Sequence, residues 1–429
     1  MSGFAILAAM LSVDSHTKSS GIYKFRAVLP FGLRVLVRAT PDSEVVSATL
    51  AVRVGSRSET SAWSGLAHLA EHVTCGQETA AAQRLSAAGG SCNAVTQPDL
   101  TLYHGQVVAE EAPTLLDRLL EILGEPAIDA RRIATEATIV GDEISAAMDS
   151  TVMGGFPWLW LPAALYDSPE LAHNGYGDLE SLRRVDEAAL TAFFSRHYRA
   201  DNAVLAICAA DPAPLMAVLG VAEREAAVPV QDHTPGPTPV LTPAAPYALI
   251  APRQPHQATA IAWSLPDQPM SWGHIATTVL ADILVGDHGG ALEEQIEALE
   301  VSAYVGPFGD PWGIAAPLPF VVEIHHSADL DPESWVPSVR EVLRSLAHDT
   351  DADAVAAAAR TLAVRFFAAW DDPAEQSKIM ATTELVYGDA NRALQIPGLL
   401  AATDPAEVRA AAAALAAAPA RLLTRGPRS

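Results

Sequence analysis

Residues 228–246 read VPVQDHTPGPTPVLTPAAP, and this stretch divides the 429-residue chain into two halves of similar length. Its prolines stand at positions 229, 235, 237, 239, 243 and 246. Proline lacks a backbone N–H and fixes φ, so such a run is incompatible with a helix or a paired strand and is typical of an extended linker. The sequence therefore predicts two domains, residues 21–227 and 247–429, joined by this linker.

The two halves follow the same pattern of predicted elements. Each begins with β-rich segments, which are residues 32–39 and 44–54 in the first half and 247–252 and 258–265 in the second. An amphipathic helix follows in each half, and long helices rich in Ala and Leu come later, at residues 110–123 and 352–370. We therefore expect an internal duplication with the fold class α+β: two homologous domains, each a mainly antiparallel sheet with helices packed on one face.

Charge and composition exclude several classes of partner. The chain has 27 Lys and Arg against 51 Asp and Glu, a net charge of −24, and half of its residues are apolar. This is the composition of a globular protein. Its negative charge repels phosphate backbones and anionic lipids, so we expect neither a nucleic-acid nor a membrane partner, and we expect any electrostatic steering to favour cationic ligands.

Targeting signals are weak in this sequence. The three cysteines are too few for a disulfide framework. Residues 3–13 are apolar, but no Lys or Arg precedes them, so they make a poor secretory signal, and no stretch of about 20 apolar residues predicts a membrane span. We expect a cytoplasmic protein.

The chemistry lies in the stretch His68-Leu-Ala-Glu71-His72, within the predicted helix of residues 64–74. Two histidines at i and i+4 lie about 40° apart around a helix, so both imidazoles can reach one ion, and Glu71 lies beside them. Zinc suits such a set, because catalytic zinc sites use three protein ligands and keep a position for water. The alternative is a polar patch without a metal.

A third ligand is needed, and the predicted helix of residues 132–148 offers two candidates. Glu136 and Glu143 are seven residues apart, two helical turns, and so share a face. Either could complete the site, and the other could orient a histidine.

At this point the chain resembles a known family. HLAEH is similar to the inverted zinc motif H-x-x-E-H of the pitrilysin/insulinase-type metallopeptidases, the inverzincins. AGGSCNAVTQPDLTLYHG (residues 88–105) and EATIVGDEI (residues 136–144) resemble further family segments, as do the stretch from Gly175 and residues 284–307 and 399–427. The resemblance covers about residues 21–427 and indicates a short, two-domain member.

The resemblance implies a set of site residues and a hydrolase mechanism. It implies one zinc per chain, with His68, His72 and Glu143 as ligands, Glu71 as the general base that activates a zinc-bound water, and Glu136 in support. It also implies that an extended peptide substrate adds to the strand edge at Asn93, Ala94, Val95 and Thr96, for which an ordinary hairpin strand is the alternative.

One departure from the family pattern concerns the second half. Active members supply an Arg and, seven residues later, a Tyr that hold the substrate carbonyl and the oxyanion; here Tyr304 matches the tyrosine, but Glu297 stands in place of the arginine. A carboxylate cannot donate to an oxyanion. A homologous partner subunit could supply the pair, Glu297 could select a basic side chain, or the chain could be catalytically weak. We favour the first.

The sequence thus predicts a zinc metalloendopeptidase subunit that cleaves short or unfolded peptides, with the processing of a peptide precursor or leader as one form of this activity. The predicted partners are a peptide substrate and a homologous subunit in a heterodimer, with a homodimer as the other option. The alternative function is a catalytically weak or non-catalytic scaffold subunit of a larger family assembly.

Overall fold

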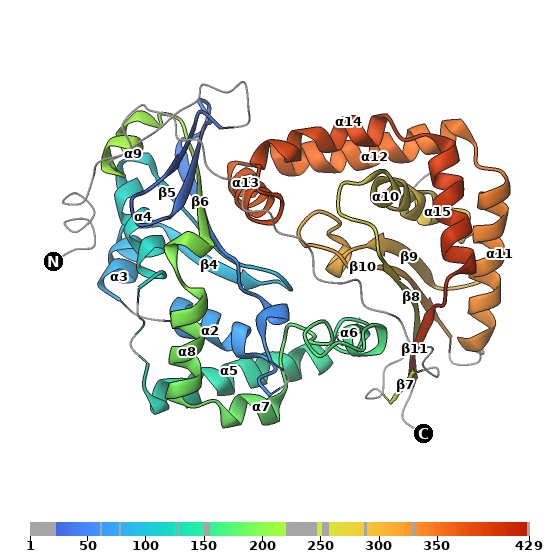
Figure 1. Cartoon of the computed structure of the whole chain (residues 1–429), viewed down its shortest axis with the longest axis horizontal. Helices are drawn as coiled ribbons and strands as arrows, with labels where there is room; N and C mark the ends of the chain where they lie inside the picture. The colour runs from blue at the N-terminus through green and yellow to red at the C-terminus, as the bar shows by residue number, and fades with distance from the viewer. Residues whose placement is uncertain are drawn as a thin grey trace. The chain divides into compact units, whose positions relative to one another are not determined.

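The computed structural model describes residues 23–60, 62–76, 79–124, 126, 128–149, 155–219, 247–250, 257–286, 290–327 and 332–426. The predicted linker, residues 228–246, lies outside these residues. The two sheets and the helices around them are shown in Figure 1.

The described residues form two compact units, each built on one sheet. One unit lies within residues 1–141, 175–233 and 367–394, and the other within residues 142–174, 234–366 and 395–429. The predicted domains are continuous in sequence, whereas each unit contains a segment from the other half of the chain. The physical reason is burial, because the segment from the other half of the chain packs on one face of the sheet in each unit.

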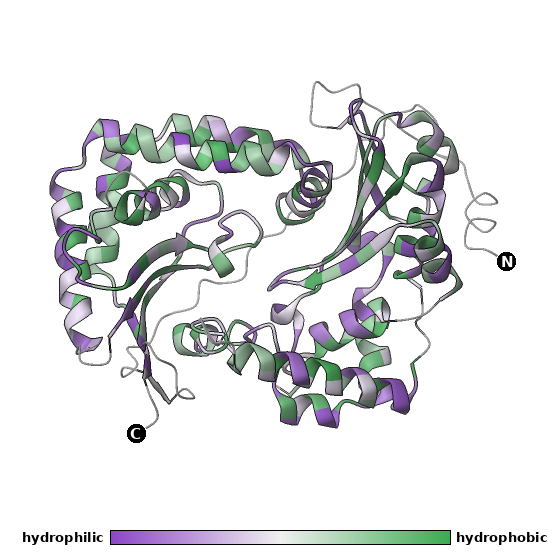
Figure 2. Ribbon diagram, turned by 180° about the vertical axis from the view of Figure 1, so that it is seen from behind, coloured by the Kyte–Doolittle hydropathy of each residue, from purple (hydrophilic) through white to green (hydrophobic). Residues whose placement is uncertain are grey.

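The first sheet has six strands in the order β1-β2-β6-β3-β5-β4. Their bounds are β1 Phe25–Val28, β2 Arg34–Ala39, β3 Val45–Val52, β4 Ser91–Thr96, β5 Thr101–Val108 and β6 Ala203–Ala209. Only the pair β2 and β6 is parallel. The central strand β6 reads AVLAICA and is buried throughout, and the middle of this sheet is mostly green in Figure 2. Strand β4 lies at the edge.

The second sheet repeats this arrangement with five strands in the order β7-β11-β8-β10-β9. The bounds are β7 Tyr247–Ile250, β8 Gln257–Leu265, β9 Glu300–Val305, β10 Leu318–His326 and β11 Arg421–Gly426. Again one pair is parallel, β7 with β11, and the others are antiparallel. Strands β7, β11, β8, β10 and β9 therefore correspond to β2, β6, β3, β5 and β4. This shared order confirms the predicted α+β class with two homologous, mainly antiparallel sheets.

Both faces of the first sheet carry helices. A Cβ atom at Gly105 would lie 2.7 Å from Cδ1 of Leu115, so α4 covers the face to which Gly105 and its strand partner Ala48 point. The next residue, Thr49, points the other way, and its hydroxyl lies 2.6 Å from that of Ser377 in α13. The first unit contains α2 Leu66–Cys75, α3 Ala80–Ala87, α4 Ala112–Glu121, most of α5 Ala130–Asp149, α7 Leu179–Arg184, α8 Glu187–His197, α9 Ala213–Val218 and α13 Pro373–Tyr387.

The second sheet is covered in the same way. The small residues Ala258, Ala260 and Ala262 point to one face of β8 and pack against Leu161 and Leu165 of α6. The other helices of this unit are α10 Trp272–Val285, α11 Trp335–His348, most of α12 Ala352–Trp370, α14 Ile396–Ala401 and α15 Pro405–Ala417. The prediction placed helices on one face of each sheet. In the structure the second face is also covered, by α13 in the first sheet and by α6 in the second.

Among the described residues, no helix combines the length and the apolar character needed to cross a lipid bilayer.

Candidate metal centre

Helix α2 carries the motif, and its apolar positions explain how the motif is presented. Leu66, Leu69, Ala70 and Val73 recur at helical spacing and are buried, which fixes one side of α2 against the protein. His68 and His72 fall on the other side and are half-buried. The helix begins after Gly65, whose φ of 94° lies in the left-handed region that glycine adopts without strain.

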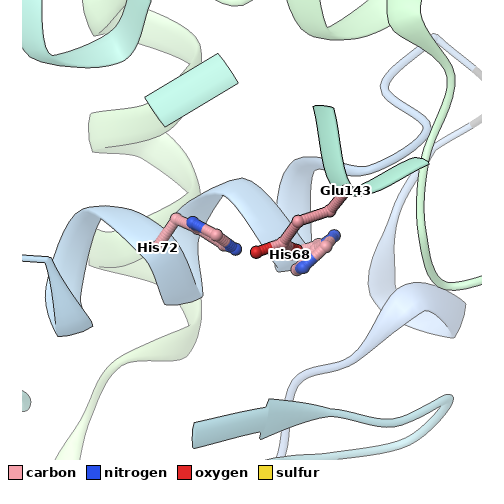
Figure 3. Close-up of side chains that lie close together, drawn as sticks. All are labelled: His68, His72 and Glu143. Atoms are coloured by element: carbon pink, nitrogen blue, oxygen red, sulfur yellow. The ribbon is translucent and has the colours of Figure 1, made fainter. Parts of the chain in front are cut away.

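The structure brings His68 and His72 together with Glu143 of α5. One ligand atom from each of the three residues lies within 4.8 Å of the others, and the two imidazole rings are 4.9 Å apart. Figure 3 shows the three side chains converging from the two helices. Helix α5 is continuous from Ala130 to Asp149, so the spacing of seven residues places both of its glutamates on the side of α2.

The polar contacts of the two histidines indicate which nitrogen of each ring is available to an ion. Nδ1 of His68 lies 3.0 Å from the backbone oxygen of Tyr176, and because a carbonyl only accepts, Nδ1 carries the proton. Nε2 of His68 therefore keeps its lone pair. Nδ1 of His72 lies 3.6 Å from Oε2 of Glu136. In both imidazoles Nδ1 faces another group of the protein. The two rings and the Glu143 carboxylate form a donor set that fits zinc, which accepts nitrogen and oxygen ligands in a tetrahedral site.

Glu71 lies next to the metal-binding set and is nearly buried, at 9% exposure. The hydroxyl of Thr96 in β4 donates a hydrogen bond of 2.7 Å to Oε2 of Glu71. Helix α2 and strand β4 are thus connected through the carboxylate that the motif predicts to be the base. Glu136 of α5 is also nearly buried, at 8% exposure, and its carboxylate lies beside His72.

Both ends of α2 are capped by charged side chains from other elements. At the N-terminus the carboxylate of Glu59 accepts hydrogen bonds from the N–H groups of Gly65 at 2.9 Å and Ala67 at 2.8 Å. At the C-terminus Arg118 donates to the Thr74 carbonyl at 2.7 Å and Arg132 donates to the Val73 carbonyl at 2.8 Å. An anion at the N-terminus and cations at the C-terminus both stabilise a helix dipole.

The predicted substrate strand lies at the open edge of the first sheet. β4 pairs with β5 on one side, and it is the last strand in the order. Asn93 and Val95 are exposed, whereas Ala94 and Thr96 point toward α2 and are half-buried. This edge offers backbone groups to an added strand. Its use by a substrate stays a prediction.

Tyr304 and Glu297 lie in the second unit. The Tyr304 hydroxyl donates a 2.8 Å hydrogen bond to Glu323 of β10, and burial beside this carboxylate raises the pKa of Tyr304 far above its ordinary value. Glu297 is exposed, just before β9. The catalytic role predicted for Tyr304 stays a prediction.

Several residues around the site carried no signal in the sequence. Glu59 contacts α2 from the loop just before it, whereas Arg118, Arg132 and the Tyr176 carbonyl contact α2 or His68 from positions far along the chain. Charged residues are common in helices and loops, so the sequence could not show which groups these residues contact.

Known proteins resemble this chain in part of its sequence and in its fold. Over 235 residues it is 32% identical to the coenzyme PQQ synthesis protein F of Pseudomonas aeruginosa, a stretch that covers 52% of this chain and 29% of the relative. It is 25% identical to the mitochondrial-processing peptidase subunit beta of Blastocladiella emersonii over 41% of this chain and 39% of the relative. The chain thus spans well under half the length of these curated relatives.

Comparison of the fold extends the likeness to both units. The crystal structure of a peptidase M16 inactive domain from Pseudomonas fluorescens superposes with a TM-score of 0.77 over 94% of this chain and 98% of that chain, at 16% identity, which shows a common fold. Residues 34–153, which include His68, His72 and Glu143, match the family model described as insulinase (peptidase family M16). Residues 34–153 are thus similar to the insulinase family of peptidases, family M16, and the motif at His68–His72 and the common fold agree with this match.

Proposed function

We propose that this chain is the zinc-binding subunit of an endopeptidase that cleaves short or unfolded peptides. The observation that carries the proposal is the convergence of ligand atoms of His68, His72 and Glu143 within 4.8 Å. The hydrogen bond from His68 to the Tyr176 carbonyl supports it, since it engages Nδ1 and leaves Nε2 on the other side of the ring for a metal. These three residues would hold one zinc ion per chain.

Zinc bound there supplies Lewis acidity, which polarises a peptide carbonyl and lowers the pKa of water to about 7. Glu71 is the general base. The Thr96 hydroxyl donates a hydrogen bond to Oε2 of Glu71. We therefore assign Oε1 of Glu71 as the oxygen that takes a proton from water and gives it to the leaving amine. Glu136 orients His72.

The substrate part of the proposal rests on strand β4. An extended peptide that pairs with Asn93, Ala94, Val95 and Thr96 would lie along the edge strand whose Thr96 contacts Glu71. Main-chain pairing requires an extended segment, which favours short or unfolded peptides and the processing of precursors or leaders. The net charge of −24 favours basic peptides.

A homologous subunit is the proposed source of the missing oxyanion donors. Glu297 cannot donate a charge-assisted hydrogen bond, and Tyr304 already donates to Glu323. The name of one relative, a subunit beta, is consistent with a family in which chains work in pairs. We therefore propose a heterodimer, with a homodimer as the alternative.

A non-catalytic scaffold is the second candidate, and two observations favour it. One is Glu297, and the other is that a solved structure with the same fold is described as an inactive domain. The presence of Glu71 beside the converging ligand atoms argues for the enzyme.

The test combines zinc content with cleavage of a library of basic peptides, for the chain alone and with a homologous subunit added. About one zinc per chain, with cleavage that requires the added subunit, is the expected result. Cleavage by the chain alone would make Glu297 a specificity residue. Zinc binding without cleavage under either condition would favour the scaffold, and the absence of zinc would refute the enzyme.

A further inference from the structure

Arg132 connects three parts of the metal centre. Its Nη2 donates to the Val73 carbonyl at 2.8 Å and lies 3.8 Å from Oε1 of Glu136. The other oxygen of Glu136, Oε2, lies 3.6 Å from Nδ1 of His72. Val73 follows His72 in the chain, so these contacts close a ring that runs through Arg132, Glu136, His72 and Val73.

The position of the Glu136 carboxylate is further limited by Gly76. A Cβ atom at Gly76 would lie 2.8 Å from Oε1 of Glu136, closer than nonbonded atoms approach. The glycine therefore leaves the space that this carboxylate occupies beside the end of α2. Its φ of −71° is accessible to alanine, so a methyl group there would act through close contacts with Glu136 and, at 3.0 Å, with the backbone oxygen of His72.

We propose that Arg132 is a positioning residue for the metal centre: it holds Glu136 against His72 and so fixes the orientation of that imidazole. The inference rests on the proposed zinc site. The guanidinium is suited to the task, because its Nη2 carries two N–H groups and is close to both the Val73 carbonyl and the Glu136 carboxylate. The Arg132 side chain is 22% exposed and that of Glu136 is 10% exposed, so solvent screens this pair only partly.

Arg118 provides a matched control. It caps the same end of α2, at the carbonyls of Thr74 and Cys75, and its ion pair is with Glu121, not with Glu136. Loss of either arginine therefore removes a helix cap. Only the loss of Arg132 also releases Glu136.

The experiment measures zinc affinity of the full chain by competition with a chromophoric chelator. Removal of a partner of a metal-binding histidine costs about 10–100-fold in affinity. Because Arg132→Met releases such a partner, Glu136, we expect it to weaken zinc binding by up to this amount and by more than threefold. Arg118→Met is expected to change it less than threefold. Arg132→Lys, which keeps the charge, is expected to recover part of the loss and serves if the methionine variant does not fold.

Two further variants separate positioning from general stability. In a Glu136→Gln background, Arg132→Met should have little further effect on zinc affinity, because the two residues act in one chain of contacts. Gly76→Ala should weaken zinc binding without removing any charge.

Equal losses for the two arginine variants, or a full loss from Arg132→Met in the Glu136→Gln background, would overturn the inference while leaving the zinc site intact. A wild-type chain that binds no zinc would overturn the proposed function and this inference with it.

Discussion

The hydroxyl of Tyr304 donates a hydrogen bond of 2.8 Å to Oε2 of Glu323, and this bond uses the one proton of the hydroxyl. Glu323 is 1% exposed, and its other oxygen lies 3.0 Å from Nε2 of His325. A buried carboxylate needs such partners, since an unsatisfied charge in the interior is costly. While this bond is kept, the tyrosine has no proton to offer an oxyanion. The catalytic role predicted for Tyr304 would therefore require this hydrogen bond to break.

Replacement of Tyr304 by phenylalanine is expected to reduce stability more than catalysis. It leaves Glu323 with one donor fewer, which should lower the free energy of unfolding by about 1–3 kcal/mol. Urea denaturation measures this loss, and kcat/KM with the homologous subunit present should change less than threefold. In a Glu323→Gln background the stability loss should shrink. A hundredfold fall in kcat with unchanged stability would show that Tyr304 is an oxyanion donor.

Replacement of Glu71 by glutamine should separate metal binding from proton transfer. Glutamine keeps the shape and the contact with Thr96 but cannot take a proton, so kcat should fall about 10²–10⁴-fold. Zinc content should stay near that of the wild type. Glu143→Gln is the comparison, because it removes a proposed ligand and should lower zinc affinity itself. Unchanged peptide cleavage by Glu71→Gln would rule out its role as the base.

Thr96 is expected to matter through its hydroxyl. Thr96→Val removes the 2.7 Å bond to Glu71 and leaves the β-branched shape that suits strand β4. A hydrogen bond to a charged group contributes about 1.5–3 kcal/mol, so we expect kcat/KM to fall at least tenfold. Thr96→Ser keeps the hydroxyl and should retain most of the activity. Equal kinetics for the valine and serine variants would mean that the bond does not orient the base.

Sequence periodicity predicted several helices and left Glu136 and Glu143 as alternative third ligands, between which the family resemblance chose Glu143. The helix predicted at residues 352–370 is α12, Ala352–Trp370, and the helix predicted at residues 64–74 is α2, Leu66–Cys75. The histidines share a face at a spacing of four, and Glu143 follows Glu136 after two turns of one helix. The structure needed only to pack α5 beside α2 to bring the ligand atoms together.

Long-range packing was not predictable in the same way. Nothing in the sequence of α13 shows that Ser377 would meet Thr49, 328 residues earlier. Likewise, the bond between Tyr304 and Glu323 depends on the register of β9 and β10, which places Glu323 opposite Ser302. Register follows from burial of whole strands, and a single sequence does not determine which strands pair.

Glu59 should stabilise the fold through the N-terminus of α2. Its buried carboxylate accepts two backbone hydrogen bonds, so Glu59→Ala leaves two N–H groups without that acceptor and should cost about 2 kcal/mol of unfolding free energy. Asp178→Ala, which removes the side-chain cap of the short helix α7, provides a comparison and should cost about 1 kcal/mol. Urea midpoints give both values. Equal losses would mean that Glu59 is an ordinary helix cap.

Acid should destabilise the protein partly through His274. This residue is fully buried in α10, its Nδ1 accepts the N–H of Met270 at 2.9 Å, and burial lowers the pKa of His274 to about 4. The unfolded chain, with a histidine pKa near 6.5, therefore binds the proton first, so stability falls as pH drops from about 6.5 toward 4. His274→Asn offers an oxygen in place of Nδ1 but does not titrate. Urea unfolding at pH 7 and pH 5 should show a smaller loss for this variant, by about 1–2 kcal/mol. Parallel losses in the two proteins would mean that His274 takes no part in the acid response.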